Sequence, residues 1–435
     1  MERIITSIFL AGGVFFLSNT SFVFCQEALP VQTAPEMSLW LSRIERERAI
    51  DSGFQLAQER VILEEMEQSR HTQFKLEEFF RRNVNPYLEI EEAYDDNIFL
   101  NPTRKKDFIT TFTPGVKINL ATEDSLLEID AGAKLTSYAV HPFMNSQDPY
   151  FRLAWDKYFN RYHLNLKERF KKDMKLRSDF IAGAEGKERY LFNDFNFIFG
   201  AEYNRLAFDL GARRYDYFYD KEFKKENNYN ENIFSLTGYT NLAPKTRLLF
   251  EYYHGIILYP EHPFPSRNCR YDEGWVGLKG DITPKIIGIA KVGYQYRVYR
   301  ARADWDQPIA SIDLVYNFKE RTSFSLKVED NAEQSLSESE NYYELMKVDI
   351  GMNHRFAFNP KLGLGIGGFY EDDDYPASSG TKRNDKIYSL RGLFSYDLQR
   401  WLFASLGYTF TERDSNLDEN DYVDHIFSLK LKGSF

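Results

Sequence analysis

The chain has 435 residues, a formal net charge of −10 and two cysteines, and 16% of its residues are aromatic, yet its mean hydropathy is −0.51. The acidic balance argues against nucleic acid as the main partner, and two cysteines exclude both a disulfide scaffold and a cysteine-based metal site. Many aromatic residues in a chain of low mean hydropathy are typical of a transmembrane β-barrel, whose strands show an apolar face to lipid and a polar face to water.

The N-terminus has the pattern of a secretory signal peptide, which we assign to residues 1–25. Arg3 precedes an apolar stretch, residues 4–17, that is too short to span a bilayer comfortably. Two alternatives stay open: an uncleaved membrane anchor, and a lipoprotein in which Cys25 is acylated rather than cleaved off. The large Phe24 disfavours acylation.

Residues 26–85 form a predicted α-helical segment whose composition differs from that of the rest of the chain. The stretch 37–82 is rich in Glu, Arg, Gln and Leu and contains no proline. Apolar residues at helical spacing are Ile50, Phe54, Ala57 and Val61. The helix should end before Pro86. It is either a solvated periplasmic helix at the end of a barrel or a coiled coil that binds itself or a periplasmic partner, although its irregular heptads do not favour a coiled coil.

From Tyr87 onward the apolar residues recur with a period of two, which is the period of a β-strand. One such stretch alternates Leu402, Ala404, Leu406, Tyr408 and Phe410 with Ser405, Thr409 and Thr411. The alternation recurs to the last residue. A helix cannot present such a pattern on one face, so this region is predicted to be all-β.

Short polar turns alternate with longer charged loops. The turns are expected near residues 122–123, 160–161, 204–205, 244–245, 284–285, 319–320, 360–361 and 399–400. The loops are expected at 100–107, 139–148, 173–189, 219–230, 259–270, 299–307, 333–343, 374–384 and 413–422. Eight turns and nine loops join 18 strands. We therefore predict an antiparallel transmembrane β-barrel of about 18 strands over residues 86–435, with the short turns and both termini in the periplasm. A β-propeller would need more turns, and a β-helix would need short Gly-rich repeats that are absent.

The C-terminal strand carries a second signal. Its apolar positions are Phe427, Leu429, Leu431, Gly433 and Phe435, and polar residues stand between them. A last strand that ends on Phe resembles the recognition signal of proteins inserted by the bacterial barrel-assembly machinery. This resemblance implies that machinery as a partner, with outer-membrane lipid and lipopolysaccharide around the folded chain.

The first strands resemble a known family. The motifs are Tyr94-Asp95-Asp96-Asn97-Ile98-Phe99, Asp107-Phe108-Ile109 and Thr113-Pro114-Gly115-Val116. They look like the opening of the putative β-barrel porin family, often encoded at bacterial exopolysaccharide loci, and the resemblance covers roughly residues 87–435. It implies a bacterial outer-membrane pore or barrel with a role in exporting or handling an extracellular polysaccharide. Pro114 removes a ladder donor and suggests a bulge.

The polar face, taken as inward, carries mixed charges. Four inward positions on consecutive strands form a predicted basic strip of pore-lining residues, namely Lys134, Arg152, Lys167 and Arg169. Side chains alone cannot fill a cylinder this wide, so water or an inserted loop must occupy it. The first hypothesis is a passive channel for a polar, saccharide-like solute. The alternative is a non-conducting barrel, held by cross-strand ion pairs, that anchors surface polysaccharide machinery through its helix.

Motifs for chemistry are scarce. The histidines lack metal-ligand spacing, and neither GxSxG nor a P-loop occurs. No catalytic residue, metal or cofactor is therefore predicted, and the chain is not expected to be an enzyme. The remaining alternative, a barrel-embedded hydrolase, would use His163, which a hydrogen bond in the lumen explains better. Two further features are expected on long loops: the acidic run 371–374, which either holds a divalent cation or is simply solvated, and Cys269.

Overall fold

The computed structural model describes residues 83–175, 188–219, 222–261, 267–300, 304–335, 342–376 and 382–435. The predicted signal peptide lies outside these ranges, as do all but the last three residues of the predicted helical segment 26–85. No helix in the described ranges is long and apolar enough to cross a membrane.

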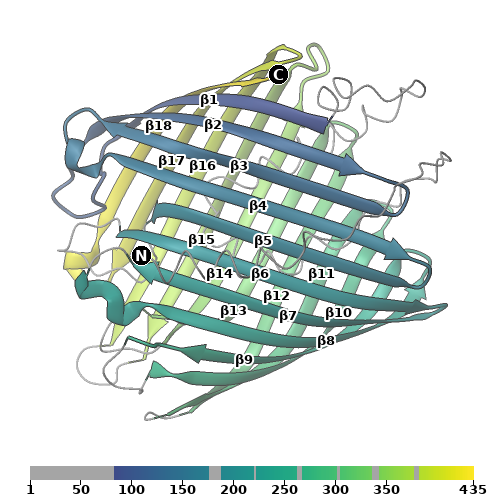
Figure 1. Cartoon of the computed structure of the whole chain (residues 1–435). Coiled ribbons are helices and arrows are strands. Elements are labelled where there is room, and N and C mark those ends of the chain that lie inside the picture. Colours follow the sequence, from purple (N-terminus) through teal and green to yellow (C-terminus); the bar gives the residue numbers. More distant parts are fainter. Residues whose placement is uncertain are drawn as a thin grey trace, which may run out of the picture. The chain divides into compact units, whose positions relative to one another are not determined.

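The described chain consists almost entirely of long strands (Figure 1). They are β1 (Val84–Asp95), β2 (Asp107–Ala121), β3 (Ser125–Tyr138), β4 (Ser146–Phe159), β5 (Tyr162–Lys175), β6 (Glu188–Tyr203), β7 (Leu206–Tyr219), β8 (Tyr229–Ala243), β9 (Thr246–Leu258), β10 (Cys269–Thr283), β11 (Ile286–Tyr299), β12 (Trp305–Lys319), β13 (Thr322–Gln334), β14 (Tyr342–Arg355), β15 (Leu362–Tyr375), β16 (Arg383–Gln399), β17 (Leu402–Ser415) and β18 (Tyr422–Ser434). In the described parts of the connections lie short 3-10 helices at Pro142–Met144, Glu222–Asn227 and Asp418–Asn420.

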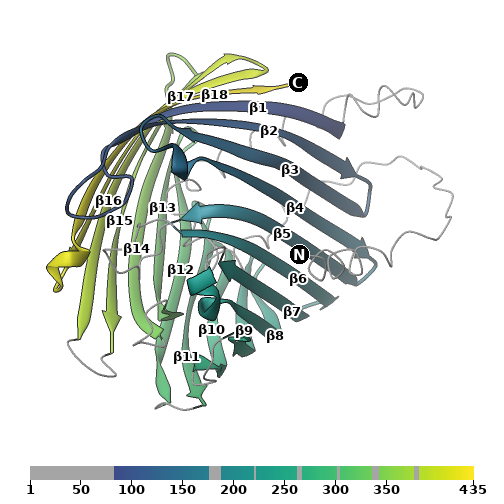
Figure 2. The ribbon, with the colours of Figure 1, turned by 60° about the vertical axis from the view of Figure 1, so that its left-hand side comes forward.

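The strands form one closed antiparallel barrel (Figures 1 and 2). Each strand pairs with its neighbours in the chain, and β1 pairs with β18 from Tyr87↔Ser434 to Asp95↔Ile426. The count of 18 strands confirms the predicted fold. Closure pairs the first strand with the last, so the sheet has no terminal edge strand.

The period of two places two kinds of side chain on the two faces of the wall. Phe108, Leu210 and Phe234 are more than half exposed on the outside, where lipid would cover them. On the inside, Glu251 and Lys291 are buried against other side chains. Because residues paired in register lie on the same face, the inward set of one strand fixes the inward set of the next.

All eight predicted turns are present, as connections of two to six residues between the strand ends. Asn160 and Asn204 start two of them with φ of 59° and 53°. Asparagine tolerates this left-handed conformation better than most residues, and two-residue hairpin turns of types I′ and II′ need it at their first position. Both ends of the described barrel lie at this short-turn end, where the Phe435 backbone N–H donates to the Pro86 carbonyl at 2.9 Å.

Two local expectations differ from the structure. Strand β1 begins at Val84, so Val84 and Asn85 are extended rather than helical. They pair with β2, whose ladder continues past Pro86. The expected bulge at Pro114 is also absent: β2 keeps one register with β3 from Phe112↔Leu135 to Gly115↔Gly132 on either side of the proline. A missing donor therefore interrupts pairing without adding a residue to the strand.

The alternation of short and long connections predicts the orientation of the barrel in a cell. Epitope tags inserted in the long connection at 259–268 should be labelled on intact cells, and tags at 244–245 should be labelled only after the outer membrane is permeabilised. The expected result is this asymmetry at every pair of connections tested. The reverse pattern would overturn the assignment of the short turns to the periplasm.

Candidate functional site

The inner face of the barrel is the candidate functional site, because the charged side chains gather there. Ion pairs cross from strand to strand along the wall. The closest are Lys291 Nζ to Glu251 Oε2 at 2.7 Å, Lys347 Nζ to Glu371 Oε2 at 2.6 Å and Arg391 Nη2 to Asp349 Oδ2 at 2.6 Å. Each side chain has a partner on another strand, so these charges bind the wall together as well as lining it.

The four residues of the predicted basic strip share this inner face. Arg152 stands directly opposite Asp130 on β3 and opposite Arg169 on β5. Lys134 stands opposite Asp148, and Lys167 stands opposite Ala154. Lys134 and Arg152 are exposed to the lumen, while Lys167 is half-buried. The register therefore gathers all four on one side of the barrel wall.

Arg169 has a more constrained position than the other three. Its Nη2 lies 3.3 Å from Asp194 Oδ2, and the same carboxylate accepts hydrogen bonds from Arg213 Nε at 2.8 Å and from Arg213 Nη2 at 3.1 Å. Two guanidinium groups thus share one carboxylate across β5, β6 and β7. The sequence pattern did not reveal that Asp194 lies between them.

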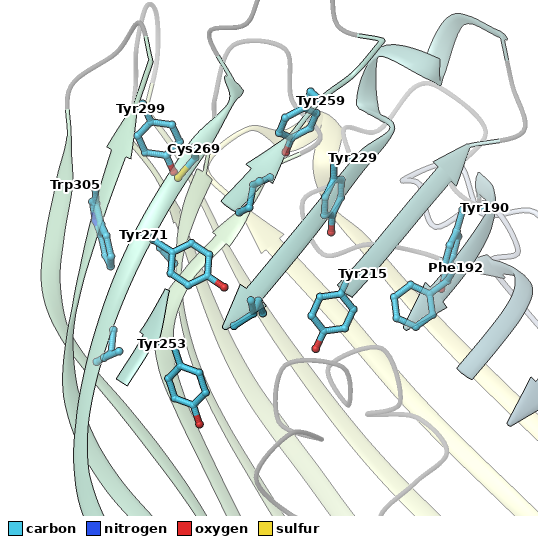
Figure 3. Close-up of a cluster of buried hydrophobic side chains, with 14 of the residues drawn as sticks. Tyr190, Phe192, Tyr215, Tyr229, Tyr253, Tyr259, Cys269, Tyr271, Tyr299 and Trp305 are labelled. Carbon is cyan, nitrogen blue, oxygen red and sulfur yellow. The ribbon is translucent and has the colours of Figure 1, made fainter. Parts of the chain in front are cut away.

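A large cluster of buried aromatic side chains, which we call the aromatic cluster, covers the inner wall of β6–β12 near the long-loop end (Figure 3). Its members include Tyr190, Phe192, Tyr215, Tyr229, Tyr253, Tyr259, Tyr271, Tyr299 and Trp305. Tyr271 lies so close to Gly255 on β9 that a Cβ there would come within 2.1 Å of the ring. Glycine at 255 therefore lets the ring lie flat against the wall.

Sequence reasoning missed the aromatic cluster because it assigned the aromatic residues to the lipid face. The signal was available in the alternation itself: Tyr215 has the same parity as the inward Arg213, and Tyr271 stands opposite Arg297. Cations lie over several of these rings, including Arg213 at 4.3 Å from the Tyr215 centroid and Lys291 at 4.4 Å from the Trp275 centroid. Rings and charges therefore form one mixed lining.

Within the lining is a small cavity of about 30 Å³, large enough for a water molecule or so. Its lining residues are Tyr215, Tyr217, Tyr229, Glu231, Arg297, Glu333 and Gln334. They come from β7, β8, β11 and β13, which are not all neighbours in the sheet. Side chains from separate parts of the wall therefore approach one another at this level of the lumen.

Two residue groups that we expected on loops lie in strands. The acidic run 371–374 belongs to β15 and pairs with β16, where Glu371 stands opposite Ile387. Asp374 accepts a hydrogen bond from Lys382, and this bond raises the pKa of the exposed Lys382 ammonium group. Cys269 is the first residue of β10 and is buried in the aromatic cluster. In the run 371–374, ladder pairing with long neighbouring strands outweighs the low strand propensity of the aspartates.

His163 lies on the inner face of β5, with its Nε2 3.2 Å from Asp209 Oδ1. The inward position agrees with the sequence prediction, while the geometry of this contact is not that of a hydrogen bond. Within the described ranges, no group of three or more His, Cys, Asp or Glu side chains is placed to hold a metal ion.

Among the solved structures to which the chain is similar are three Pseudomonas proteins. OpdK of Pseudomonas aeruginosa is 10% identical, with a TM-score of 0.47 over 81% of this chain and 99% of that chain. OccK2 (OpdF) of Pseudomonas aeruginosa, solved with glucuronate, is 8% identical, with a TM-score of 0.46 over 81% and 98% of the two chains. A BenF-like porin of Pseudomonas fluorescens is 11% identical, with a TM-score of 0.46 over 81% and 99%.

No curated protein sequence matches this chain. The family description is more informative, because residues 83–435 match the family described as putative beta-barrel porin 2. That range begins one residue before β1 and ends with the chain, so it covers the whole described barrel. It is also the family that the motifs of the first strands resemble. The closed wall, its apolar outer belt and its charged inner face thus belong to a porin-like outer-membrane barrel, and the chain is a member of the putative beta-barrel porin 2 family.

Proposed function

We propose that the barrel is a passive channel for a polar solute of the saccharide type, linked to the export or handling of an extracellular polysaccharide. The observation that carries the proposal is the inner face, which has exposed basic side chains such as Lys134 on β3 and Arg152 on β4 and the tyrosines of the aromatic cluster on β6–β12. Tyrosine rings offer flat apolar faces with a polar tip, and charged groups offer donors and acceptors. A hydrated, hydroxyl-rich solute can use both along such a wall.

Conductance of the purified full-length protein in a planar bilayer tests the proposal. We expect stepwise, ohmic conductance at neutral pH, together with swelling of proteoliposomes in small neutral sugars. Heat-denatured protein serves as the control for leakage caused by detergent. A barrel that is shown to be folded but neither conducts nor admits sugars would contradict the channel.

A second candidate function has a specific observation in its favour. The aromatic cluster fills part of the inner wall at the long-loop end, and buried ion pairs cross the wall between strands, as a non-conducting barrel that anchors polysaccharide machinery would require. In that case the N-terminal helical segment would bind a periplasmic partner. A barrel-embedded hydrolase using His163 is weaker, and unchanged hydrolysis of lipid and glycan substrates in His163→Ala would dismiss it.

Delivery to the outer membrane is part of the same proposal. The signal peptide would route the chain to the periplasm, and the last strand would present its apolar residues to the barrel-assembly machinery. Phe427, Leu429 and Phe435 are each at least half exposed on the outer face, and the Phe435 ring stacks on Trp401 with centroids 5.8 Å apart. An exposed aromatic at the end of the last strand is accessible to a recognising partner.

A further inference from the structure

The barrel wall has a seam between β12 and β13. Strand β12 pairs with β11 along nearly its whole length, up to Arg297↔Trp305, but its pairing with β13 stops at Ala310↔Asp330. Beyond that point residues 305–309 and 331–334 are both still strands, and they are not paired with each other. Pro308 lies in the stretch of β12 that is paired with β11 but not with β13, and proline cannot donate to a ladder on the open side.

Beyond the seam, the described residues of the β13–β14 hairpin turn into the lumen. We call residues 331–335 and 342–345 the infolded tip; its two halves pair from Asn331↔Leu345 to Gln334↔Tyr342. The Tyr342 ring stacks on Tyr299, with centroids 5.7 Å apart, and lies 5.8 Å from the Trp305 ring. Tyr299 and Trp305 belong to the inward-facing set of β11 and β12 (Figure 3). A ring that packs on them must lie inside the barrel.

The same face of the tip makes the other contacts with the inner wall. Glu344 Oε1 accepts hydrogen bonds from Trp305 Nε1 at 2.9 Å and from Gln307 Nε2 at 2.8 Å. Gln334 Oε1 accepts from the Tyr259 hydroxyl at 3.3 Å. Nearer the short-turn end of the hairpin, Phe324 lies on the same face of β13 as Gln334, and there it is exposed on the lipid side. One face of the hairpin thus passes from the outside of the wall to the inside at the seam.

Charged side chains of the wall hold the backbone of the tip. Arg297 donates to the carbonyl of Ala332, and Arg267 donates to the carbonyl of Ser335. Ala332, Ser335 and Leu345 are almost completely buried. The opposite face carries Glu333 into the cavity that Tyr215 and Tyr229 also line. The tip therefore reaches from β13 to side chains of β7 and β8 across the lumen.

We propose that the infolded tip is the constriction that sets the largest solute the channel admits. The proposal rests on the channel function proposed above. The β14 half of the tip stays paired with β15 at Glu344↔Asp374 and Leu345↔Asp373. No ladder joins the tip to β12, and on that side it is held by the side-chain contacts of Glu344, Tyr342, Arg297 and Arg267. Loss of those contacts releases the tip while the pairing of β12 with β13 below Ala310 remains intact. Released, the tip leaves a wider lumen at the same level.

The test uses one protein in two states. In a Cys269→Ser background, the variant Trp305→Cys/Tyr342→Cys/Glu344→Ala loses the two rings and the carboxylate that hold the tip. In the reduced state we expect larger single-channel conductance than wild type and uptake of maltooligosaccharides that wild type excludes. Linking the two thiols with a short reducible bis-methanethiosulfonate should restore the wild-type exclusion limit, and a reductant should abolish it again.

A matched control places the thiols below the seam, where Ser311→Cys/Glu329→Cys stand directly opposite in the β12–β13 ladder. This pair should keep the wild-type exclusion limit whether linked or reduced. Heat-modifiable migration checks that every variant is a folded barrel.

Four outcomes decide the proposal. If wild type conducts and the reduced variant admits larger sugars, the tip is the constriction. If wild type conducts and the reduced variant has the same limit, the constriction is elsewhere while the channel function stands. If only the reduced variant conducts, the tip is a complete plug, and the passive open channel is wrong. If neither the folded reduced variant nor wild type conducts, the constriction and the channel are both overturned.

Discussion

Reversing the two lysines of the last strand, Lys430→Glu/Lys432→Glu, should prevent most of the chain from forming a closed barrel. Lys430 Nζ lies 3.1 Å from Glu89 Oε1 and 3.3 Å from Glu91 Oε2, and Lys432 Nζ lies 3.8 Å from Glu89 Oε2. The reversal would put four carboxylates in one row at the pairing of β1 with β18. Two like charges roughly 4 Å apart cost about 4 kcal/mol at an effective dielectric constant of about 20. Loss of the heat-modifiable, membrane-inserted form is the measurement.

The compensating variant distinguishes a role in the pairing of β1 with β18 from a role in the assembly signal. Glu89→Lys/Glu91→Lys alone should fail in the same way, although it leaves the last strand unchanged. The fourfold exchange should recover most of the folded protein, because opposite charges again face each other in the same register. A Lys430→Gln/Lys432→Gln control should lose less than either reversal. Failure of the fourfold exchange to recover would mean that the lysines act through recognition of the last strand.

Replacing the basic strip, Lys134, Arg152, Lys167 and Arg169, by Gln should move the reversal potential of the channel towards cation preference. Fixed charges that line a passage concentrate their counter-ions and set which ion passes. The effect should shrink at high salt, because the screening length falls to roughly 3 Å near 1 M. Folding should survive, because Arg213 still accompanies Asp194 when Arg169 is lost, and the lipid face is unchanged.

A control with the same change in net charge distinguishes the strip from the overall charge of the protein. Lys157, Lys245, Lys285 and Lys361 lie at or next to the short turns, and their replacement by Gln should leave the reversal potential near that of wild type. If the strip variant has the wild-type reversal potential at low salt, the four residues have structural roles and do not select ions.

The strand count and the turns could be read from the sequence because both are local properties. A period of two between polar turns defines each strand without reference to its neighbours. The face of one strand then fixes the face of the next, because residues paired in register lie on the same side of the wall. Once Lys117 is taken as inward, the antiparallel register places Lys134, Arg152 and Arg169 on the same face. Composition was less reliable at strand ends. The run 371–374 and Cys269 look like loop residues, yet the ladders of adjacent strands extend over them.

What the sequence by itself determined is therefore a closed, even-numbered barrel with an apolar outside and a charged inside, since each of these features repeats within a strand and its turn. The partners across the wall were decided only by the tertiary structure. Lys430 meets Glu89 because closure brings together the two ends of the barrel sequence, and Arg169 shares Asp194 with Arg213 because three registers align. The infolded tip is the strongest case. The apolar alternation of Phe324, Leu326 and Val328 breaks at Asp330, where the ladder with β12 ends, but the sequence does not show where the chain goes beyond that point. The tip turns into the lumen because rings and guanidinium groups of the inner wall bind it in place of a ladder. Such contacts join residues far apart in the chain, and a local period carries no information about them.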